Sequence, residues 1–399
     1  MIAAVTALTA AAGCGSDGGG NTGGAGGSSS SSTTSSSSTG TGGSGTSSST
    51  GTGGSGGGVT CLDGATFADL FTIADASFCA VALYEADEDV GFQAPTWGTH
   101  GGPLWFVPDA SGGGVTLERW SVPAGSTGKL TKQTTHVGTQ IPDGAYAGGQ
   151  AIDLPFFGWT AISWTGAFPD TVGEVIMIEG SAVDRTYAVN GAYSVAGVGD
   201  ATAGRLLYTA LSPIGAPTTD VNGFYAADAC DMPKPDLGAG TGCQAPAEIA
   251  AWGDSSGPVA VDKDGNAFVV LASFGTGDQE ARGFAAGEVA RGAKATAGAS
   301  LFTLPAFGSS LAAITPKNGK PGSLVFQPFD MNATPLDVIA QAYTVSSSVA
   351  AQGTPAKLLS MPANGAVSLA LMTDDADRLW VAASGDKKTT FVVLDRKTP

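Results

Sequence analysis

Short apolar runs separated by turn residues make up most of the chain from residue 59 to its end. The runs are four to six residues long, and Gly, Pro, Asn and Asp stand between them. This texture predicts β-strands joined by tight turns. Two stretches, 64–73 and 333–341, instead carry a pattern that predicts short helices. We therefore expect an all-β domain.

Six units of a strand, a polar turn and a second strand follow one another, each roughly 50–60 residues after the last. A single sheet of this size cannot bury its apolar faces alone, so sheets repeated at this period predict a six-bladed β-propeller-like domain. A two-domain β-sandwich is the alternative fold. We place the first strands of the units at 104–107, 161–164, 206–209, 259–261, 311–314 and 368–372.

Two motifs recur along the chain and support this division. The pattern W-G-x-x-x-G-P occurs at 97–103 and at 252–258. The pattern L-P-x-F-G-x-[ST]-x-x-x-x-T occurs at 154–165 and at 304–315, with a looser copy at 361–373. We interpret the copies as equivalent places in different units.

One unit also resembles a known family. The stretch VAVDKDGNAFV at 259–269 resembles the repeat of NHL and SMP-30-like propellers, where a V-x-V-D strand leads through a DGN turn into a second apolar strand. The resemblance covers this unit and implies a propeller fold rather than an activity.

The first 58 residues have a different composition. The run MIAAVTALTAAAGC resembles the end of a bacterial lipoprotein signal, in which Ala11, Ala12 and Gly13 precede the modified Cys14. Residues 15–58 are almost only Gly, Ser and Thr, which predicts a flexible, disordered linker. We expect a signal peptide at 1–13, a lipid-anchored linker at 14–58 and the propeller at 59–399. By resemblance to bacterial sorting rules, the lipid places the protein at the outer membrane, on a side that the sequence leaves open.

Four cysteines remain once Cys14 carries a lipid. An even number of cysteines in an exported chain predicts two disulfides. Three pairings are open, and the local one is favoured because each bond then closes a short loop. The residues are Cys61 with Cys79 and Cys230 with Cys243. The sequence has no Cys-x-x-Cys, so it does not predict a structural zinc site.

The net charge limits the partners. The chain carries a formal charge of −17 and no cluster of Lys and Arg, so a nucleic-acid backbone would be repelled. We expect a membrane partner through the N-terminal lipid and a protein, glycan or small ligand of unknown identity, but no nucleic acid.

The stretch GDSSGP at 253–258 differs by one residue from the GDSGGP that surrounds the nucleophile of chymotrypsin-like proteases. Ser255 would be that nucleophile, but Ser256 replaces the glycine after it. Neither His100 nor His136 stands in the family's TAAHC pattern, and the repeat aligns Ser255 with His100. We interpret Ser255 as a turn residue.

Two other groups are candidate binding residues. Asp262, Asp264 and Asn266 alternate along a turn and are candidate Ca²⁺ ligands, although Ser273 stands where such a loop needs Glu. Propeller hairpins use the same residues for turn geometry alone, which is the favoured interpretation. His100, placed among glycines and near Trp97 and Trp105, is the candidate ligand-binding residue.

These observations predict an exported, lipid-anchored protein that binds a ligand and acts as a surface scaffold. The alternative is a propeller-type hydrolase or lactonase with a metal in the central channel. A trypsin-like serine protease comes third. We assign no catalytic residue, and Ca²⁺ is the one cofactor that the sequence suggests.

Overall fold

A computed structural model gives the fold of the chain. All described residues belong to one unit, Gly56–Pro399. The predicted signal peptide, with Cys14, and the linker up to residue 58 lie outside them. The described residues are 59–67, 69–87, 96–97, 104–106, 115–138, 146–147, 152–154, 159–165, 173–179, 182–188, 192–198, 205–210, 223–228, 247–251, 257–272, 279–290, 292–304, 307–329, 336–361, 366–374, 376–385 and 388–397.

Six antiparallel sheets follow one another along the chain, and we number them as blades 1 to 6. In blade 2, the short strands Tyr146–Ala147 and Ile152–Leu154 both pair with Trp159–Thr165, so together they serve as a broken first strand. Blade 1 contains β3 (Thr96–Trp97), β4 (Leu104–Phe106), β5 (Val115–Ser121) and β7 (Thr131–Gly138). Blade 2 contains β8 (Tyr146–Ala147), β9 (Ile152–Leu154), β10 (Trp159–Thr165), β11 (Gly173–Glu179) and β12 (Ala182–Ala188). Blade 3 contains β13 (Ala192–Val198), β14 (Arg205–Ala210), β15 (Gly223–Asp228) and β16 (Ala247–Ala251).

Blades 4 to 6 continue the same order, and strands from the start of the chain extend the last two. Blade 4 contains β17 (Val259–Val261), β18 (Ala267–Ala272), β19 (Gln279–Phe284) and β20 (Ala299–Leu304). Blade 5 contains β21 (Phe307–Ile314), β22 (Gly322–Phe329), β23 (Leu336–Val345), β24 (Val349–Met361) and the added β1 (Thr72–Ile73). Blade 6 contains β25 (Ala366–Thr373), β26 (Leu379–Gly385), β27 (Lys388–Arg396), β2 (Phe78–Ala86) and the added β6 (Thr127–Lys129).

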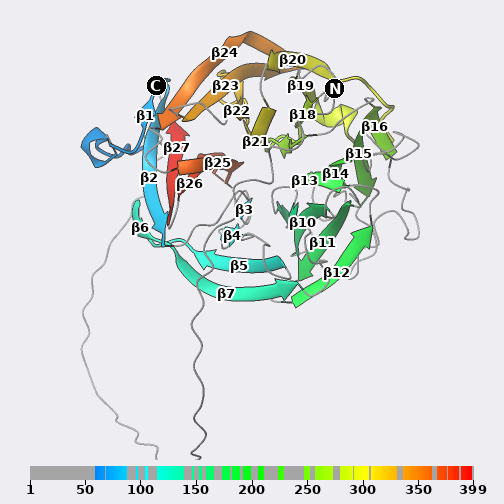
Figure 1. The fold of residues 1–399 in the computed structure, drawn as a ribbon. Helices are drawn as coiled ribbons and strands as arrows, with labels where there is room; N and C mark the ends of the chain where they lie inside the picture. Colours follow the sequence, from blue (N-terminus) through cyan, green and yellow to red (C-terminus); the bar gives the residue numbers. More distant parts are fainter. Residues whose placement is uncertain are drawn as a thin grey trace, which may run out of the picture. The chain divides into compact units, whose positions relative to one another are not determined.

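The first strands of consecutive blades touch one another and close a ring. The contacts run from β3 to β9, from β9 to β13, then through β17, β21 and β25 back to β3. Figure 1 shows β3, β13, β21 and β25 around the centre, with β7, β12, β24 and β2 at the rim. The domain is therefore a six-bladed β-propeller, as the sequence predicts.

Ring closure uses both ends of the domain. β2 is the fourth strand of blade 6 and pairs antiparallel with β27, from Phe78 opposite Arg396 to Ala86 opposite Thr389. β6, which lies between two strands of blade 1, pairs in parallel with β2 and so links blade 1 to blade 6. The first and last blades are thus joined by backbone hydrogen bonds in addition to side-chain packing.

A disulfide secures the start of the closing strand. Cys61 and Cys79 are bonded, with their Cα atoms 5.7 Å apart. Leu62 N donates to Ala80 O at 2.7 Å, and Lys397 N donates to Ser77 O at 2.8 Å. The segment between the cysteines buries Phe71 against blades 5 and 6. Cys230 and Cys243 lie outside the described residues.

The apolar core lies between neighbouring blades. Successive residues of one strand alternate between two interfaces: Leu379 and Val381 face blade 5, whereas Trp380 and Ala382 face the side where Trp120 of blade 1 packs. Similar clusters join blade 3 to blade 4 and blade 4 to blade 5. Each fully buried Leu, Val or Phe side chain stabilises the ring by about 1.5–3 kcal/mol.

Hydroxyl groups connect the first strands across the blades. The first strand of a blade is an edge strand, so half of its N–H groups lack a partner in their own sheet. Val259 N donates to Ser194 Oγ of the preceding blade at 3.1 Å, and Leu371 N donates to Ser310 Oγ at 2.8 Å. Both serines follow a register shift in their strands, which turns them toward the next blade.

The structure corrects the strand of the blade at which three of the predicted units begin. The predicted first strands at 259–261, 311–314 and 368–372 do begin blades, but those at 104–107, 161–164 and 206–209 fall on second strands. The motif copies are displaced accordingly. Trp97 lies in the first strand of blade 1, whereas position 252 follows the last strand of blade 3. The copy at 154–165, which is the closer to 304–315 in sequence, leads into a second strand. The copy at 361–373, which is the looser in sequence, leads into a first strand, as 304–315 does.

Both helix predictions were wrong. Residues 64–73 contain one 3₁₀ turn, η1 (Gly64–Thr66), and the strand β1. Residues 336–345 form β23, which pairs with β22 on one side and β24 on the other. In β23, hydrogen bonds to the strands on both sides satisfy the backbone groups that a helix would satisfy internally. Burial in the sheet thus overrides the local helix propensity.

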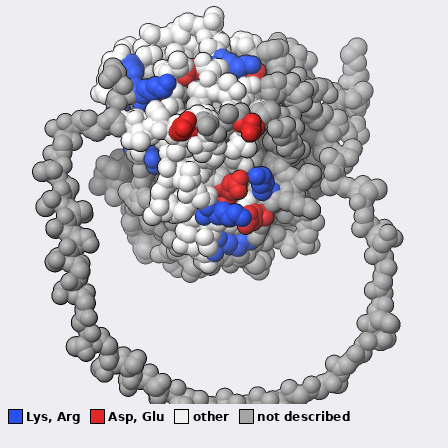
Figure 2. Space-filling model, turned by 90° about the vertical axis from the view of Figure 1, so that its left-hand side faces the viewer, with Lys and Arg blue, Asp and Glu red and all other residues white. Residues whose placement is uncertain are grey.

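Charged side chains of both signs are interspersed on the described surface. Figure 2 shows this on the face that carries the closing strands. Ion pairs there include Lys129 with Asp87 at 2.7 Å and Lys388 with Glu85 at 3.2 Å, all exposed. Exposed pairs of this kind contribute little to stability. Within the described ranges, no helix is both long and apolar enough to cross a membrane.

Removing the disulfide tests its part in ring closure. The bond spans 18 residues, so Cys61→Ser with Cys79→Ala should lower the free energy of unfolding by about 3 kcal/mol. Urea unfolding followed by tryptophan fluorescence measures this. Wild-type protein under the same oxidising conditions is the control, so that the predicted Cys230–Cys243 bond stays intact in both proteins. A loss below about 1 kcal/mol would show that strand pairing alone closes the ring.

Candidate functional site

Asp262, Asp264 and Asn266 lie together in the turn between β17 and β18. Asp262 Oδ1 accepts hydrogen bonds from Asp264 N at 3.0 Å and Asn266 N at 2.9 Å. Asn266 Nδ2 donates to the two carboxylate oxygens at 3.1 and 2.9 Å. The carboxylate therefore folds the turn around itself, as Asp does in Asx turns.

A side chain from the next blade completes this group. The Tyr343 hydroxyl lies 2.7 Å from Asp262 Oδ2 and 3.0 Å from Ile314 O. Tyr343 is fully buried and Asp262 is 4% exposed. Burial raises the pKa of Asp262, and the hydrogen bonds from Asn266 and Tyr343 offset part of that rise. Burial and the nearby Asp262 also raise the pKa of Tyr343.

This arrangement bears on the predicted Ca²⁺ site. Ca²⁺ needs six to eight oxygen ligands, but both oxygens of Asp262 already accept hydrogen bonds from protein groups. The Asn266 amide oxygen accepts from Ala286 N at 3.0 Å. Among the residues that the structure describes, no three or more His, Cys, Asp or Glu side chains are grouped to hold a metal ion. The geometry supports a turn-forming role for these residues.

A second turn, between β25 and β26, has the same bonding. Asp374 Oδ1 accepts from Ala376 N at 2.9 Å and Arg378 N at 3.0 Å. Its Oδ2 accepts from Arg378 Nε at 2.8 Å and Trp380 Nε1 at 2.9 Å. The backbone bonds of the two turns also correspond. The sequence predicts corresponding turns here, but DKDGN and DDADR share little beyond the first Asp, so their common bonding could not be predicted from the residues.

Thr315 links these two turns through blade 5. It follows β21 directly, as Asp262 and Asp374 follow the first strands of their own blades. Lys263 N donates to Thr315 Oγ1 at 2.9 Å, and Thr315 N donates to Asp377 Oδ1 and Oδ2 at 3.1 Å each. Arg396 Nη1, from the end of β27, donates to Thr315 O at 3.1 Å.

We call these residues the hairpin lock, because they join the turns of three blades at one end of the ring. Side chains from third strands, Tyr343 and Arg396, each reach back to the preceding blade. The polar groups of the lock bond to one another, which is the requirement for burying them. Its members are Asp262, Asn266, Thr315, Tyr343, Asp374, Asp377 and Arg396.

The protease-like stretch has a structural explanation. A Cβ atom at Gly257 would lie 2.1 Å from Val270 O, so only glycine fits there. Thr209 Oγ1 donates to Gly257 O at 2.7 Å, and Val270 N donates to Pro258 O at 3.1 Å. The Gly-Pro pair thus leads the chain into blade 4 against blade 3.

The fold itself argues against a chymotrypsin-like serine protease. His100 and Ser255 lie outside the described residues, and His136 lies in β7 of blade 1. A propeller differs from the double β-barrel of chymotrypsin-like enzymes.

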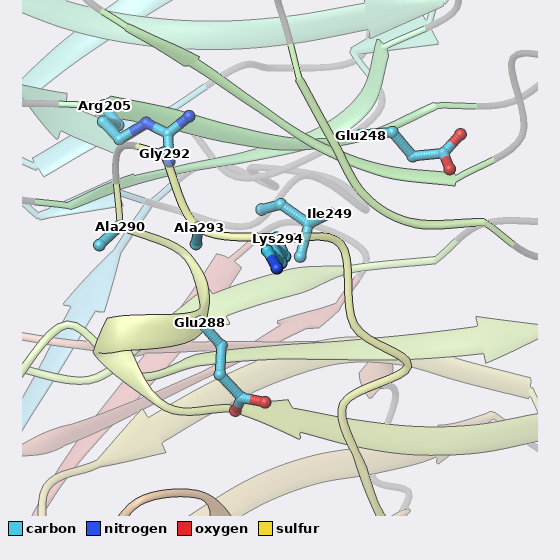
Figure 3. A pocket seen from close by; sticks show the side chains of 8 residues that line it. All are labelled: Arg205, Glu248, Ile249, Glu288, Ala290, Gly292, Ala293 and Lys294. Atoms are coloured by element: carbon cyan, nitrogen blue, oxygen red, sulfur yellow. The ribbon is translucent and has the colours of Figure 1, made fainter.

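One small cavity lies between blades 3 and 4 (Figure 3). Its volume is about 40 Å³, room for a few waters and far less than the roughly 300 Å³ of the smallest ligand pockets. Arg205 donates to Val289 O, and Glu288 caps its own 3₁₀ turn, η2 (Ala286–Glu288), by accepting from Ala285 N. Figure 3 shows Glu288 pointing away from Arg205. The lining residues are Arg205, Glu248, Ile249, Glu288, Ala290, Gly292, Ala293 and Lys294.

Comparison with known proteins shows the fold and no more. No protein-family model and no curated protein sequence matches the chain. A glucose dehydrogenase crystal structure matches with a TM-score of 0.51 and 13% identity, covering 78% of this chain and 99% of that one. An α-L-arabinofuranosidase, Arb93A from Fusarium graminearum, matches with a TM-score of 0.47 and 13% identity, covering 82% and 96%. At this identity, the first match supports a complete propeller and leaves the activity open.

Removing the Tyr343 hydroxyl tests the lock. Tyr343→Phe takes a donor from the buried Asp262 carboxylate, so we expect the free energy of unfolding to fall by about 1–3 kcal/mol. Urea unfolding measures the loss. A double-mutant cycle with Asp262→Asn should give a coupling of at least about 0.5 kcal/mol. Additive losses would mean that Tyr343 acts through its ring alone.

Proposed function

We propose that this protein is an exported, lipid-anchored propeller enzyme of the hydrolase or lactonase kind, acting on a small polar molecule. The substrate site lies at the end of the ring opposite the hairpin lock. The observation that carries the proposal is the lock itself, because it engages polar side chains of blades 4 to 6 at its own end in hydrogen bonds between blades. The residues at that end hold the blades together, so we expect the substrate to bind at the other end.

The structural likeness agrees with a catalytic use of the ring. The propeller that matches along 99% of its length is named a glucose dehydrogenase, which acts on a small polar sugar. Propellers host many unrelated activities, so this likeness supports a catalytic scaffold without choosing the reaction. A divalent metal such as Ca²⁺ in the central channel belongs to the proposal.

A binding scaffold for a protein or glycan is the second candidate. The observation that favours it is the size of the described cavity, which is too small for a substrate. The two functions differ in one measurable property, since an enzyme turns its ligand over and a scaffold does not.

Turnover assays separate the two. The full chain should hydrolyse at least one member of a panel of lactones and esters, and EDTA should abolish the activity until Ca²⁺ or another divalent ion is added back. Metal content by mass spectrometry should show about one ion per chain. Tyr343→Phe, assayed at a temperature where it stays folded, is the matched control and should keep full activity. Binding of a glycan or peptide without any turnover would instead establish the scaffold.

The lipid anchor is tested separately. Cys14→Ser should move the protein from the outer-membrane fraction to the soluble fraction, because the acyl chains supply the membrane affinity. Fractionation and labelling with a radioactive fatty acid measure this, and Ser16→Ala is the control that should stay at the membrane. Membrane association that survives Cys14→Ser would refute the anchor without touching the enzymatic proposal.

A further inference from the structure

The outer strand of blade 5 presents an open edge. β24 runs for 13 residues, and among the described strands β1 alone pairs with its outer side, opposite Leu359 and Ser360. Figure 1 shows β24 along the rim of the ring, with β1 at one of its ends. Seven of the eight residues at 350–357 are exposed. An open edge of this kind offers unpaired N–H and C=O groups to any other extended chain.

A wide bulge interrupts this edge. The three residues at 353–355 of β24 stand opposite a single residue of β23, Gln341, and regular pairing resumes on both sides of them. Gly353 has a φ of 70°, in the left-handed region that favours glycine. Pro355 has no N–H to donate. The bulge therefore bends the strand and breaks the regular row of groups that a further strand would need.

The side chain of Gln341 holds the bulge from inside the sheet. It is 0% exposed, and its Nε2 donates to Ala342 O at 2.8 Å, to Gln352 O at 3.1 Å and to Gly353 O at 3.4 Å. Its Oε1 is buried without a hydrogen-bond partner among the described residues, which costs stability. The same face of β23 otherwise packs in an apolar cluster. A polar side chain kept there at this cost indicates a use other than packing.

Apart from the bulge, this stretch suits pairing with a second copy of the chain. Residues 349–357 read VAAQGTPAK, with three alanines and no Asp or Glu, although the chain as a whole carries a charge of −17. Its one charged residue, Lys357, forms an ion pair at 2.7 Å within its own blade. An antiparallel edge can pair with the same edge of an identical chain about a two-fold axis.

We propose that the outer edge of β24 at 349–357 is a latent pairing site for a second copy of this chain, and that the bulge pinned by Gln341 keeps the site closed. Without the bulge, the strand would add its N–H and C=O groups to the same edge of another molecule and join two propellers rim to rim. The bulge removes the regular spacing that such a ladder requires. The protein thereby stays monomeric although one of its sheets ends in a long exposed strand.

Repairing the bulge tests the proposal. Deleting Thr354 and Pro355 leaves one residue opposite Gln341 and keeps the later side chains on their own faces, because the faces of a strand alternate with a period of two. Gly353→Thr and Gln341→Val then suit the regular ladder and the apolar face. All proteins are full chains that carry Cys14→Ser, so that no lipid contributes to association. Sedimentation velocity between about 1 and 100 μM should show a monomer for the bulged protein and a dimer dissociation constant at least about tenfold lower for the repaired one.

Two added lysines provide the matched control. In the repaired protein, Ala350→Lys with Ala356→Lys should restore the monomer, because like charges would meet across the paired edge. A repaired protein that keeps the circular dichroism of the bulged one and is equally monomeric would overturn the proposal. Association that survives both lysines would also overturn it, because the contact would then lie elsewhere. If the repaired protein does not fold, Pro355→Thr, which restores an N–H at the bulge, decides by the same measurement.

Discussion

Each sheet in this protein can bury its two faces only between two neighbours, and the rest of the structure follows from this constraint. Alternate residues of blade 6 pack toward blade 5 and toward blade 1, so a missing neighbour would expose half of its apolar side chains. The ring must therefore close. Closure is provided by β2 from the start of the domain, which completes the blade formed by the end of the chain. The disulfide, β1 and β6 all act near this joint.

The sequence predicts the kind of fold and the number of blades because both depend on local patterns. Apolar runs of strand length and turns such as DG and NG indicate hairpins, and six hairpins lie where they are expected. Which strand of a blade a hairpin begins with does not depend on local patterns. A hairpin of first and second strands reads like one of second and third strands, so three units are displaced by one strand. The stretch 333–341 was predicted as helix because the two partner strands of β23, which begins at Leu336, cannot be read from its own residues.

The hairpin lock shows the same division. The residues of one turn, Asp262 to Asn266, stand out in the sequence because they are close together. Tyr343 contacts Asp262 from 81 residues away, and Asp377 contacts Thr315 across 62 residues. Nothing in the letters around Tyr343 or Thr315 marks them as partners of a turn in another blade. The signal that could have found the lock is the shared place of Asp262, Thr315 and Asp374, each directly after a first strand.

The pairing of β2 with β27 also sets an order for synthesis. β2 is among the first strands to leave the ribosome, and its partner is the last, with Phe78 opposite Arg396. Until the final residues emerge, β2 has an open edge that can pair with other chains. The bond between Cys61 and Cys79 spans 18 residues and can form long before β27 exists. An early crosslink there would restrain the waiting strand, so the yield of folded protein should depend on when this cysteine pair is oxidised.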